Sequence, residues 1–451
     1  MHLRDKPPAT ARSEDAPIAA QGKAPLQMQN YSERVIDNEL DELISGAPAI
    51  ALDGAKGVGK TVTAARRAMT TLALDDLEQR ELVAADIGAA LRTERPILID
   101  EWQRLPHIWD AVRRAVDAGA SPGSFLLTGS AGITGPGTHS GAGRILRVRM
   151  YPLSLAERGI ETPSVSLGAL LTGSRERLEG TTRVALQDYG AEILASGFPG
   201  IRSMRDRVRT AQMDGYLARI VDRDFAEANH VVRRPAALTN WLRAYAAATS
   251  TVATLETIRD AATGDQSEKP SRASTVSYRE VLTRLWILDP VPAWLPTANV
   301  MTELTQWPKH HLVDPALAAR LLGVTAQSLT PGGGCGTMAT TSASMFGPLF
   351  ESLVAQSARV YAQHAQASLH HLRTAKGRHE VDLIVRAPDH RIVAIEVKLG
   401  ATVSDDDVRH LHWLRDKLGD ELADAIVVTT GSAAYRRADG IGVVPAALLG
   451  P

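Results

Sequence analysis

The sequence contains one glycine-rich segment whose spacing specifies a particular chemistry: Gly54-Ala55-Lys56-Gly57-Val58-Gly59-Lys60-Thr61. It fits the pattern G-x-x-x-x-G-K-[ST] and lies between a short apolar run at 49–52 and a predicted helix at 62–72, which is the context in which backbone amides surround phosphate groups. Glycines are needed because a Cβ would obstruct the close approach of phosphate oxygens. We therefore expect this segment to bind ATP, with Lys60 on the β and γ phosphates and Thr61 as a ligand of Mg²⁺.

Two neighbouring carboxylates follow a second apolar run at 96–99, namely Asp100 and Glu101. An enzyme with such a phosphate-binding loop needs one carboxylate in the shell of Mg²⁺ and another residue to orient the attacking water. We assign Asp100 to Mg²⁺ and Glu101 to water activation. Alone, carboxylates at a strand end are equally typical of solvated turns or helix caps, so this assignment depends on the glycine-rich segment.

Three further side chains are candidates for sensing the phosphates. A third apolar run at 124–127 ends in Thr128 and Ser130, whose hydroxyls would lie near the γ phosphate in a parallel sheet, although ordinary turn residues give the same pattern. Arg144 could place a guanidinium on the transition-state phosphate, within one subunit or across an oligomer interface. The alternative for Arg144 is a surface arginine at the start of a strand.

A second group of charged residues lies near the C-terminus. Strand-like runs at 380–385 and 392–397 predict a hairpin, in which Asp382, Glu396 and Lys398 would converge. Such a set suits magnesium-assisted phosphodiester hydrolysis, because carboxylates hold the ion and a lysine stabilises charge or positions water. The alternative is that these are strand-end charges paired in solvent.

The elements that must position these residues indicate several domains, since 451 residues exceed what one core usually organises. Strand and helix signals alternate in the first part, which predicts an α/β fold with a mostly parallel sheet. The spacing then becomes mainly helical and is followed by a Gly/Ser/Thr-rich stretch and a last α/β segment. The predicted divisions are a disordered tail at 1–30, an AAA-like ATP-binding domain at 31–160, a helical or winged-helix middle region at 161–329, a linker at 330–344 and an α/β domain at 345–451.

Composition narrows the class of protein. Hydrophobic residues make up 44% and charged residues 22%, which is typical of a folded globular chain. A net charge of -1 argues against a protein that coats polyanions, although local basic clusters are compatible with binding to DNA. Cys335 is the single cysteine, and no window is apolar enough for a membrane span, so we expect a cytoplasmic protein without a membrane partner.

The middle region is locally basic. Four arginines, Arg202, Arg205, Arg207 and Arg209, lie close together and could follow a phosphate backbone. Interspersed acids such as Asp206 make a solvated helix face equally plausible.

The order and spacing of several segments resemble a prokaryotic family of AAA-like ATPases: 54–61, 98–106, 127–130, 143–144 and 151–154. Segments 196–200 and 311–315 also look like that family, so the resemblance covers most of the chain from about Tyr31. It implies an ATPase core, a helical or winged-helix middle and a C-terminal domain of unknown function. The chain departs from the family at Lys56, where arginine is more frequent, and at Trp102, where an aliphatic residue is more frequent.

The C-terminal residues resemble the PD-(D/E)xK restriction-endonuclease-like superfamily, with Glu351 on the preceding amphipathic helix as a third carboxylate for a metal ion. Such folds also occur as inactive binding domains. The leading hypothesis is an ATPase that controls a DNA-directed nuclease-like domain. Because AAA-like enzymes often form rings, an oligomer of this chain is compatible with the hypothesis. The alternatives are a nucleotide-dependent binding switch that recognises nucleic acid or protein without cutting, and a nuclease with a vestigial ATP site.

Overall fold

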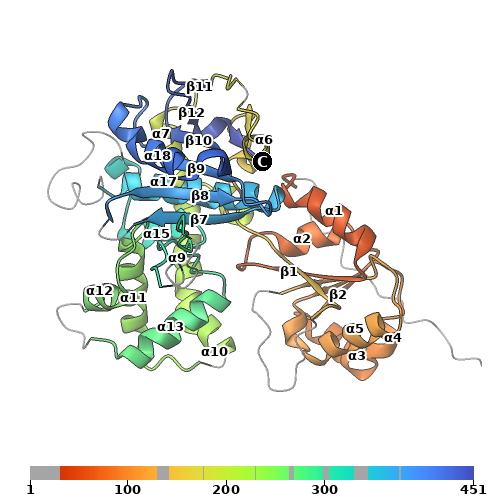
Figure 1. The fold of residues 1–451 in the computed structure, drawn as a ribbon. Helices are drawn as coiled ribbons and strands as arrows, with labels where there is room; N and C mark the ends of the chain where they lie inside the picture. Colours follow the sequence, from red (N-terminus) through yellow and green to blue (C-terminus); the bar gives the residue numbers. More distant parts are fainter. Residues whose placement is uncertain are drawn as a thin grey trace, which may run out of the picture.

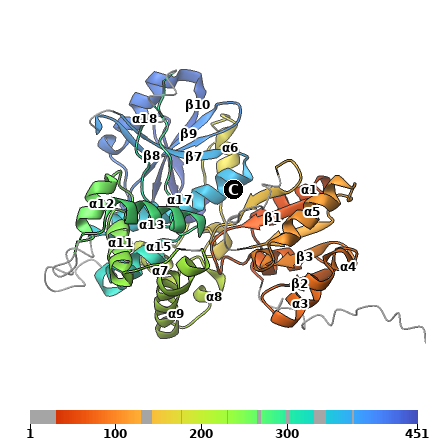
Figure 2. The ribbon, with the colours of Figure 1, turned by 90° about the horizontal axis from the view of Figure 1, so that it is seen from below.

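The computed structural model describes residues 31–451 apart from 130–141, 176, 229, 264–268, 298–302, 304, 330–343 and 375–376. In the view of Figure 1 the C-terminal α/β unit (blue) lies above a set of helices (green), and the N-terminal α/β unit (red to orange) lies beside them; Figure 2 shows the same three parts from below. The predicted disordered tail, Ser130, Cys335 and the predicted linker except Ser344 lie outside the described residues. Among the described helices, none is both long enough and apolar enough to cross a membrane.

The first unit contains a five-stranded sheet in the order β2-β3-β4-β1-β5, with every pairing parallel. The strands are β1 (Ala49–Asp53), β2 (Thr70–Ala73), β3 (Ile97–Asp100), β4 (Phe125–Thr128) and β5 (Leu146–Arg149). Every residue of β1, β3 and β4 is buried, as expected where helices cover both faces of a parallel sheet. The predicted α/β architecture of this part is confirmed.

The helices of the first unit are α1 (Ile36–Gly46), α2 (Lys60–Ala65), α3 (Leu77–Ala85), α4 (Ile87–Ala90), the 3-10 turn η2 (Trp102–Arg104) and α5 (His107–Asp117). The predicted helix at 62–72 is wrong beyond Ala65, because Thr70–Ala73 form β2 and pair with β3. Pairing with a buried strand outweighs the helical spacing there, and the β-branched pair Thr70 and Thr71 suits a strand.

The middle region is helical. Its elements are α7 (Leu186–Ala195), α8 (Pro199–Arg202), α9 (Asp206–Arg219), the π-helical turn η4 (Ile220–Asp224), α10 (Phe225–Glu227), α11 (Pro235–Ala247), α12 (Leu255–Ala261), α13 (Arg272–Arg284), α15 (Pro315–Leu322) and the 3-10 turn η5 (Gln327–Leu329). After α13, isolated antiparallel bridges join Leu288 to Leu312 and Val291 to Lys309. These bridges lie where a wing was expected, and the winged-helix assignment itself stays a prediction.

The C-terminal unit contains a six-stranded mixed sheet in the order β11-β12-β10-β9-β8-β7. Its elements are α17 (Phe346–His364), β7 (Ser368–Arg373), β8 (Glu380–Arg386), β9 (Ile392–Val397), α18 (Asp405–Leu418), η7 (Gly419–Glu421), β10 (Leu422–Thr429), β11 (Tyr435–Arg436), β12 (Gly442–Pro445), η8 (Ala446–Leu448) and β13 (Leu449–Gly450). The strands β7, β8 and β9 run antiparallel, whereas β10 is parallel to both β9 and β12. The predicted hairpin of β8 and β9 is confirmed.

The start of the predicted middle region, 161–184, instead packs on the C-terminal unit. The short strand β6 (Val165–Ser166) pairs with β13, and α6 (Leu167–Leu171) contacts α17, β9 and β10. Arg175 also donates hydrogen bonds to the carbonyl oxygens of Leu422 and Ala423. These residues, which the sequence analysis assigned to the middle region, therefore contact the C-terminal sheet. Strand pairing over such a distance leaves no local spacing signal.

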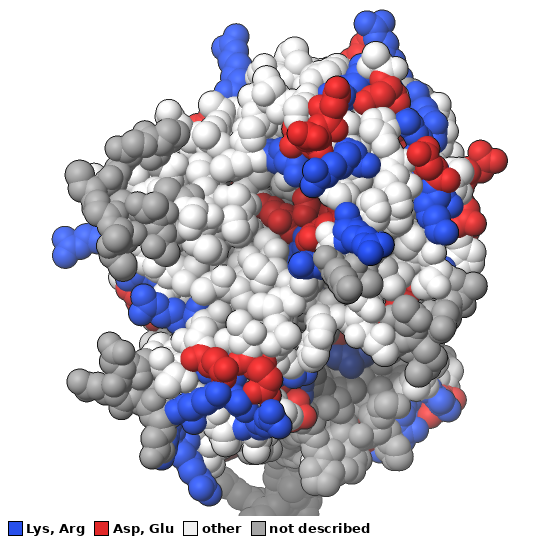
Figure 3. All heavy atoms as spheres, turned by 60° about the vertical axis from the view of Figure 1, so that its left-hand side comes forward, with Lys and Arg blue, Asp and Glu red and all other residues white. Residues whose placement is uncertain are grey.

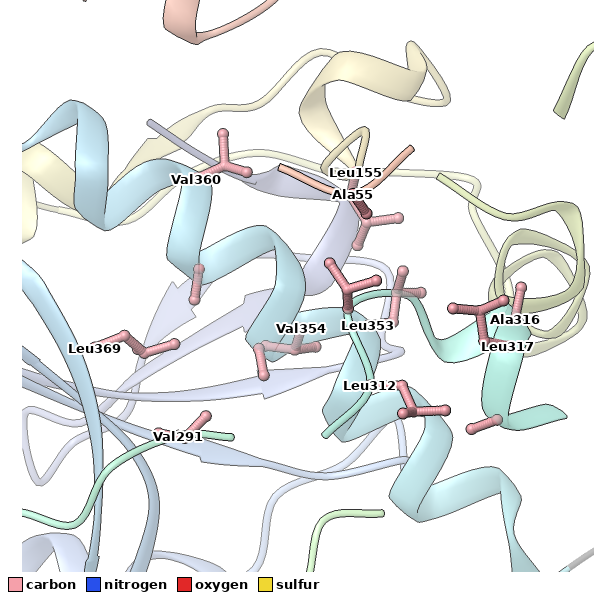
Figure 4. Packing of buried hydrophobic residues seen from close by; sticks show 14 of the residues in the cluster. Ala55, Leu155, Val291, Leu312, Ala316, Leu317, Leu353, Val354, Val360 and Leu369 are labelled. Carbon is pink, nitrogen blue, oxygen red and sulfur yellow. The ribbon is translucent and has the colours of Figure 1, made fainter. Parts of the chain in front are cut away.

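One helix, α17, connects all parts of the molecule. Its apolar residues belong to a buried cluster to which the first unit, the middle helices and the C-terminal sheet all contribute. Figure 4 shows Leu353 of α17 in this cluster together with Leu155, which follows β5, and Leu312 of the middle region. Close packing of this kind transmits a shift of one element to its neighbours.

Candidate nucleotide site and C-terminal carboxylate site

The glycine-rich segment begins at the end of β1 and leads directly into α2. Gly54, Gly57 and Gly59 have φ values of 150°, 84° and 106°. These conformations are unfavourable for residues that carry a Cβ. A Cβ on Gly54 would also lie 2.3 Å from the carbonyl oxygen of Met150. The backbone geometry therefore favours glycine at positions 54 and 59, which the sequence pattern specifies, and also at position 57, where the pattern allows any residue.

Lys60 is folded against this loop. Its Nζ donates hydrogen bonds to the carbonyl oxygens of Gly54 at 2.7 Å and Ala55 at 2.9 Å, and the side chain is buried. Burial lowers the pKa of Lys60 to about 8, because removal from water disfavours the charged ammonium. The ammonium group of Lys60 is thus held by neutral carbonyl groups.

Thr61, Asp100 and Thr128 meet at the carboxyl edge of the sheet. The hydroxyl of Thr61 donates to Oδ1 of Asp100 at 2.8 Å, and the hydroxyl of Thr128 donates to the same oxygen. The adjacency follows from the strand order, since β3 and β4 pair with Asp100 opposite Thr128. Hydroxyl and carboxylate oxygens are ligands that Mg²⁺ accepts, so these side chains fit the ion expected from the sequence.

Glu101 follows directly, with a positive φ of 53°. Its Oε2 accepts a hydrogen bond of 2.5 Å from Nε2 of Gln103. Burial, together with the negative charge of Asp100, raises the pKa of Glu101 above that of an ordinary glutamate. The structure therefore brings Lys60, Thr61, Asp100 and Glu101 to one edge of the sheet.

Arg144 lies elsewhere. Its Nε is 2.9 Å from Oδ1 of Asp117, the last residue of α5. Arg144 precedes β5, whose first residue pairs with Ile50 near the beginning of β1, whereas the phosphate-binding loop follows the other end of β1. The structure does not bring Arg144 to the phosphate-binding loop of its own chain, so only a role across a subunit interface stays a prediction.

One cation near the loop, Arg34, was missed in the sequence analysis. Arg34 is buried and donates to the carbonyl oxygens of Val58 at 2.9 Å and Tyr151 at 2.6 Å. Its Nε also bonds Glu157 at 2.9 Å. Arg34 thus fixes the loop from outside the pattern, through contacts that no local motif indicates.

Lys56 joins the loop to the middle region. Its Nζ lies 2.7 Å from Oδ1 of Asp224 and 2.9 Å from Oε2 of Glu227, and its carbonyl oxygen accepts a hydrogen bond of 3.1 Å from Tyr216. Asp224 ends the π-helical turn η4, a rare conformation that is frequent at functional sites. The sequence placed Lys56 in the loop but gave no indication of its acidic partners.

The predicted C-terminal residues line one cavity of about 400 Å³, together with Asp406, Arg409 and His410. Asp382 and Glu396 are opposite one another on β8 and β9, as the pairing of the next residues, Leu383 with Ile395, requires. Nζ of Lys398 lies 2.8 Å from Oε1 of Glu396. Figure 3 shows acidic side chains set back among basic ones in a hollow of one face.

A lysine from the middle region enters this site and was not anticipated. Nζ of Lys309 lies 2.9 Å from Oε1 of Glu351 and 3.0 Å from Oδ1 of Asp382, and only 1% of the side chain is exposed. Within the described ranges, no three His, Cys, Asp or Glu side chains form a group arranged to hold a metal ion. Glu351 and Asp382 are bridged by an ammonium group.

The electrostatics of the carboxylates differ from one another. Burial raises the pKa of Glu351 and of Glu396 to about 8 in each case. The ammonium of Lys309 and the backbone amide of Val397 hold the pKa of Asp382 below its usual value despite burial. Oε2 of Glu396 is buried without a hydrogen-bond partner, which is costly for a polar atom unless a ligand or a proton satisfies it.

Comparison with known proteins agrees with the first of these sites. Residues 46–158 match a family described as an AAA domain, whereas residues 186–328 and 346–449 match two domains of unknown function, DUF8612 and DUF4143. The chain is similar to two uncharacterized proteins, Mb2031c of Mycobacterium bovis and Rv2008c of Mycobacterium tuberculosis. Each is 24% identical to it, and each alignment covers 98% of this chain and 90% of the relative's length.

Among solved structures, the chain is similar to the Walker-type ATPase paby2304 of Pyrococcus abyssi, with 15% sequence identity and a TM-score of 0.38. The alignment covers 65% of this chain and 97% of the other chain. The family match and the geometry of the loop, Thr61 and Asp100 together identify residues 46–158 as a P-loop domain of the ATPase type.

Proposed function

We propose that the protein is an Mg²⁺-dependent ATPase whose nucleotide cycle acts on a DNA-directed, nuclease-like C-terminal site. The observation that carries the first half is the hydrogen bond between Thr61 and Asp100 directly beside the phosphate-binding loop. In a P-loop enzyme a hydroxyl and a carboxylate placed in this way would hold Mg²⁺ beside the bound nucleotide.

In this proposal each residue at the sheet edge has a separate task. Thr61 and Asp100 would hold Mg²⁺, which supplies neutralisation of the phosphate charge when it is bound. Lys60 leaves the carbonyl oxygens of the loop and contacts the β and γ phosphates. Glu101 accepts a hydrogen bond from the attacking water and orients it, and Thr128 lies close enough to Asp100 to respond to loss of the γ phosphate.

The C-terminal half of the proposal rests on the cavity and on Glu396. A buried carboxylate oxygen without a partner is suited to an incoming cation, and Asp382 and Glu351 line the same cavity. These three carboxylates would hold a divalent metal, which supplies charge stabilisation at a phosphodiester, while Lys398 stabilises developing charge. DNA is the expected substrate class because arginine and lysine side chains, Arg409 and Lys398, line the same cavity.

A second candidate function is a nucleotide-dependent binding switch without cleavage. The contacts of Lys309 favour it, because an ammonium already neutralises Glu351 and Asp382. In that case the C-terminal unit recognises nucleic acid or a protein, and ATP only orders the interface with the middle region.

The test is ATP turnover by the wild-type protein and Glu101→Gln with Mg²⁺, without DNA and with double-stranded, single-stranded or branched DNA. Turnover that depends on Glu101 and is stimulated by DNA is the expected result. Tight ATP binding without turnover under every condition would favour the binding switch. Cleavage of labelled DNA that disappears in Glu396→Ala would reject the switch and support the nuclease-like site.

A further inference from the structure

We propose that Lys309 is a resident cation of the C-terminal site, which competes with a divalent metal for Glu351 and Asp382. The site then takes up metal only when the segment around Lys309 withdraws from α17 and β8. This inference rests on the proposed metal-dependent C-terminal function and adds a control to it, since the molecule carries within its own chain the group that blocks the site.

The geometry is that of an ion held by ligands from two elements. Nζ of Lys309 contacts Oε1 of Glu351 on α17 at 2.9 Å and Oδ1 of Asp382 on β8 at 3.0 Å, and Glu380 lies 3.7 Å away. An ammonium and a metal ion need the same carboxylate oxygens, so they cannot both occupy the space between Glu351 and Asp382.

A second observation indicates that the site is built for more than this ion pair. Oε2 of Glu396, whose residue is only 6% exposed, is buried and has no hydrogen-bond partner, and Glu396 lines the cavity of about 400 Å³ together with Asp382. Lys398 pairs with the other oxygen of Glu396, Oε1, and Lys309 bridges Glu351 and Asp382, so neither ion pair satisfies Oε2. The unsatisfied oxygen and the cavity leave a position for a cation of higher charge.

The position of Lys309 in the chain gives a route for control by nucleotide. Lys309 belongs to the middle region and exchanges two backbone hydrogen bonds of 2.9 Å with Val291. Two residues earlier, Asp289 bonds Arg149 at 3.0 Å and Arg359 of α17 at 2.9 Å. Arg149 is the last residue of β5, so the segment that carries Lys309 is connected by ion pairs to the sheet that holds the phosphate-binding loop.

The experiment measures Mn²⁺ binding to the full chain without nucleotide by electron paramagnetic resonance. We compare the wild type, Lys309→Met, Asp382→Asn, the combination of these two substitutions, and Lys417→Met as a control that removes an exposed lysine outside the cavity. Lys309→Met should bind Mn²⁺ about tenfold more tightly or better, as expected when a close competing charge is removed. The tighter binding should disappear in the double variant and should be absent in Lys417→Met, which leaves Lys309 in place.

A second measurement uses the wild-type protein, in case Lys309→Met fails to fold with two unpaired carboxylates. Acetylation of each lysine by acetic anhydride is followed by mass spectrometry with and without Mn²⁺, and the exposed Lys417 serves as reference. Displacement by metal should make the buried Lys309 react several-fold faster relative to Lys417.

The two possible failures are distinguishable. If Asp382→Asn abolishes Mn²⁺ binding of the wild type but Lys309→Met does not tighten it and acetylation of Lys309 is unchanged, the resident-cation role is overturned and the metal site stands. If no variant binds Mn²⁺ at a site sensitive to Asp382, the proposed metal-dependent function is overturned together with this inference.

Discussion

The backbone amide of Ala156 donates a hydrogen bond of 3.0 Å to the phenolic oxygen of Tyr361. One helical turn earlier, the hydroxyl of Ser357 accepts from the amide of Leu155 at 3.1 Å. Both acceptors belong to α17, which also carries Glu351, so the segment that follows the P-loop sheet is attached to the helix of the C-terminal site. A movement of this segment on nucleotide binding would reach Glu351 through one rigid element.

Removing the hydroxyl in Tyr361→Phe should lower the free energy of unfolding by about 1 kcal/mol, because the partly buried amide of Ala156 loses its acceptor. Urea denaturation followed by circular dichroism measures the effect. Tyr435→Phe is the control, since Tyr435 is 42% exposed and its hydroxyl remains accessible to water. Equal stability of the two variants would show that the contact contributes nothing.

Asp289→Asn should be more damaging, because it leaves Arg149 and Arg359 beside an uncharged side chain in a buried position. We expect a loss of about 3 kcal/mol, the usual consequence of removing one partner of a buried ion pair. The same urea titration measures this loss. Asp117→Asn is the control, because the ion pair of Asp117 with Arg144 is exposed and should contribute little to the free energy of unfolding. A loss no larger than that of the control would contradict the role given to Asp289.

Gly54→Ala should abolish ATP binding. The added Cβ would lie 2.3 Å from the carbonyl oxygen of Met150, at a φ of 150° that alanine rarely adopts, so the loop must change shape. Gly46→Ala is the matched control, since a Cβ there meets no atom within 4 Å. Isothermal titration with ATP and Mg²⁺ should give wild-type affinity for Gly46→Ala and no heat for Gly54→Ala.

ATP affinity should fall as the pH rises above about 8. Burial lowers the pKa of Lys60 to about 8 in the nucleotide-free protein, so the ammonium loses its proton as the pH passes through that value, and only the charged form attracts phosphate. Above this pH, binding must take up a proton, and affinity should fall by up to about tenfold per pH unit.

Titrations between pH 7 and 9.5 in buffers of different ionisation enthalpy would detect this proton uptake. Lys60→Arg should give a flat profile if it binds ATP, because a guanidinium keeps its charge in this range. A flat profile for the wild type would mean that Lys60 is fully charged throughout.

Lys56→Met should loosen the contact between the loop and the middle region. Its Nζ is the nearest cation to both Asp224 and Glu227, at 2.7 Å and 2.9 Å. Without it these carboxylates would keep the longer contacts with Arg219 and Arg104, which do not reach the loop. Hydrogen exchange of residues 216–227 should become faster than in the wild type. Lys56→Arg should restore protection because it keeps the charge, and unchanged exchange in Lys56→Met would rule out a restraining role.

The parts of the site that lie close together in the sequence could be predicted. The loop Gly54 to Thr61 was identified because its eight consecutive residues specify a turn and the start of a helix directly after an apolar strand. Asp382, Glu396 and Lys398 were expected together because a short hairpin connects their strands, and β8 and β9 do pair in that way. The predicted end of the helix that follows the loop was wrong, because residues 70–73 are stabilised more by pairing with β3 than by extending α2.

The sequence by itself determined the phosphate-binding chemistry and the alternation of elements, because both depend on local spacing. Only the tertiary structure decided which charges meet across distance. Lys309 is 42 residues from Glu351 and 73 from Asp382, and Lys56 is 168 residues from Asp224. Such partners are selected by the packing of whole elements around a shared core, and a buried lysine in the chain has no local pattern that distinguishes it from an exposed one.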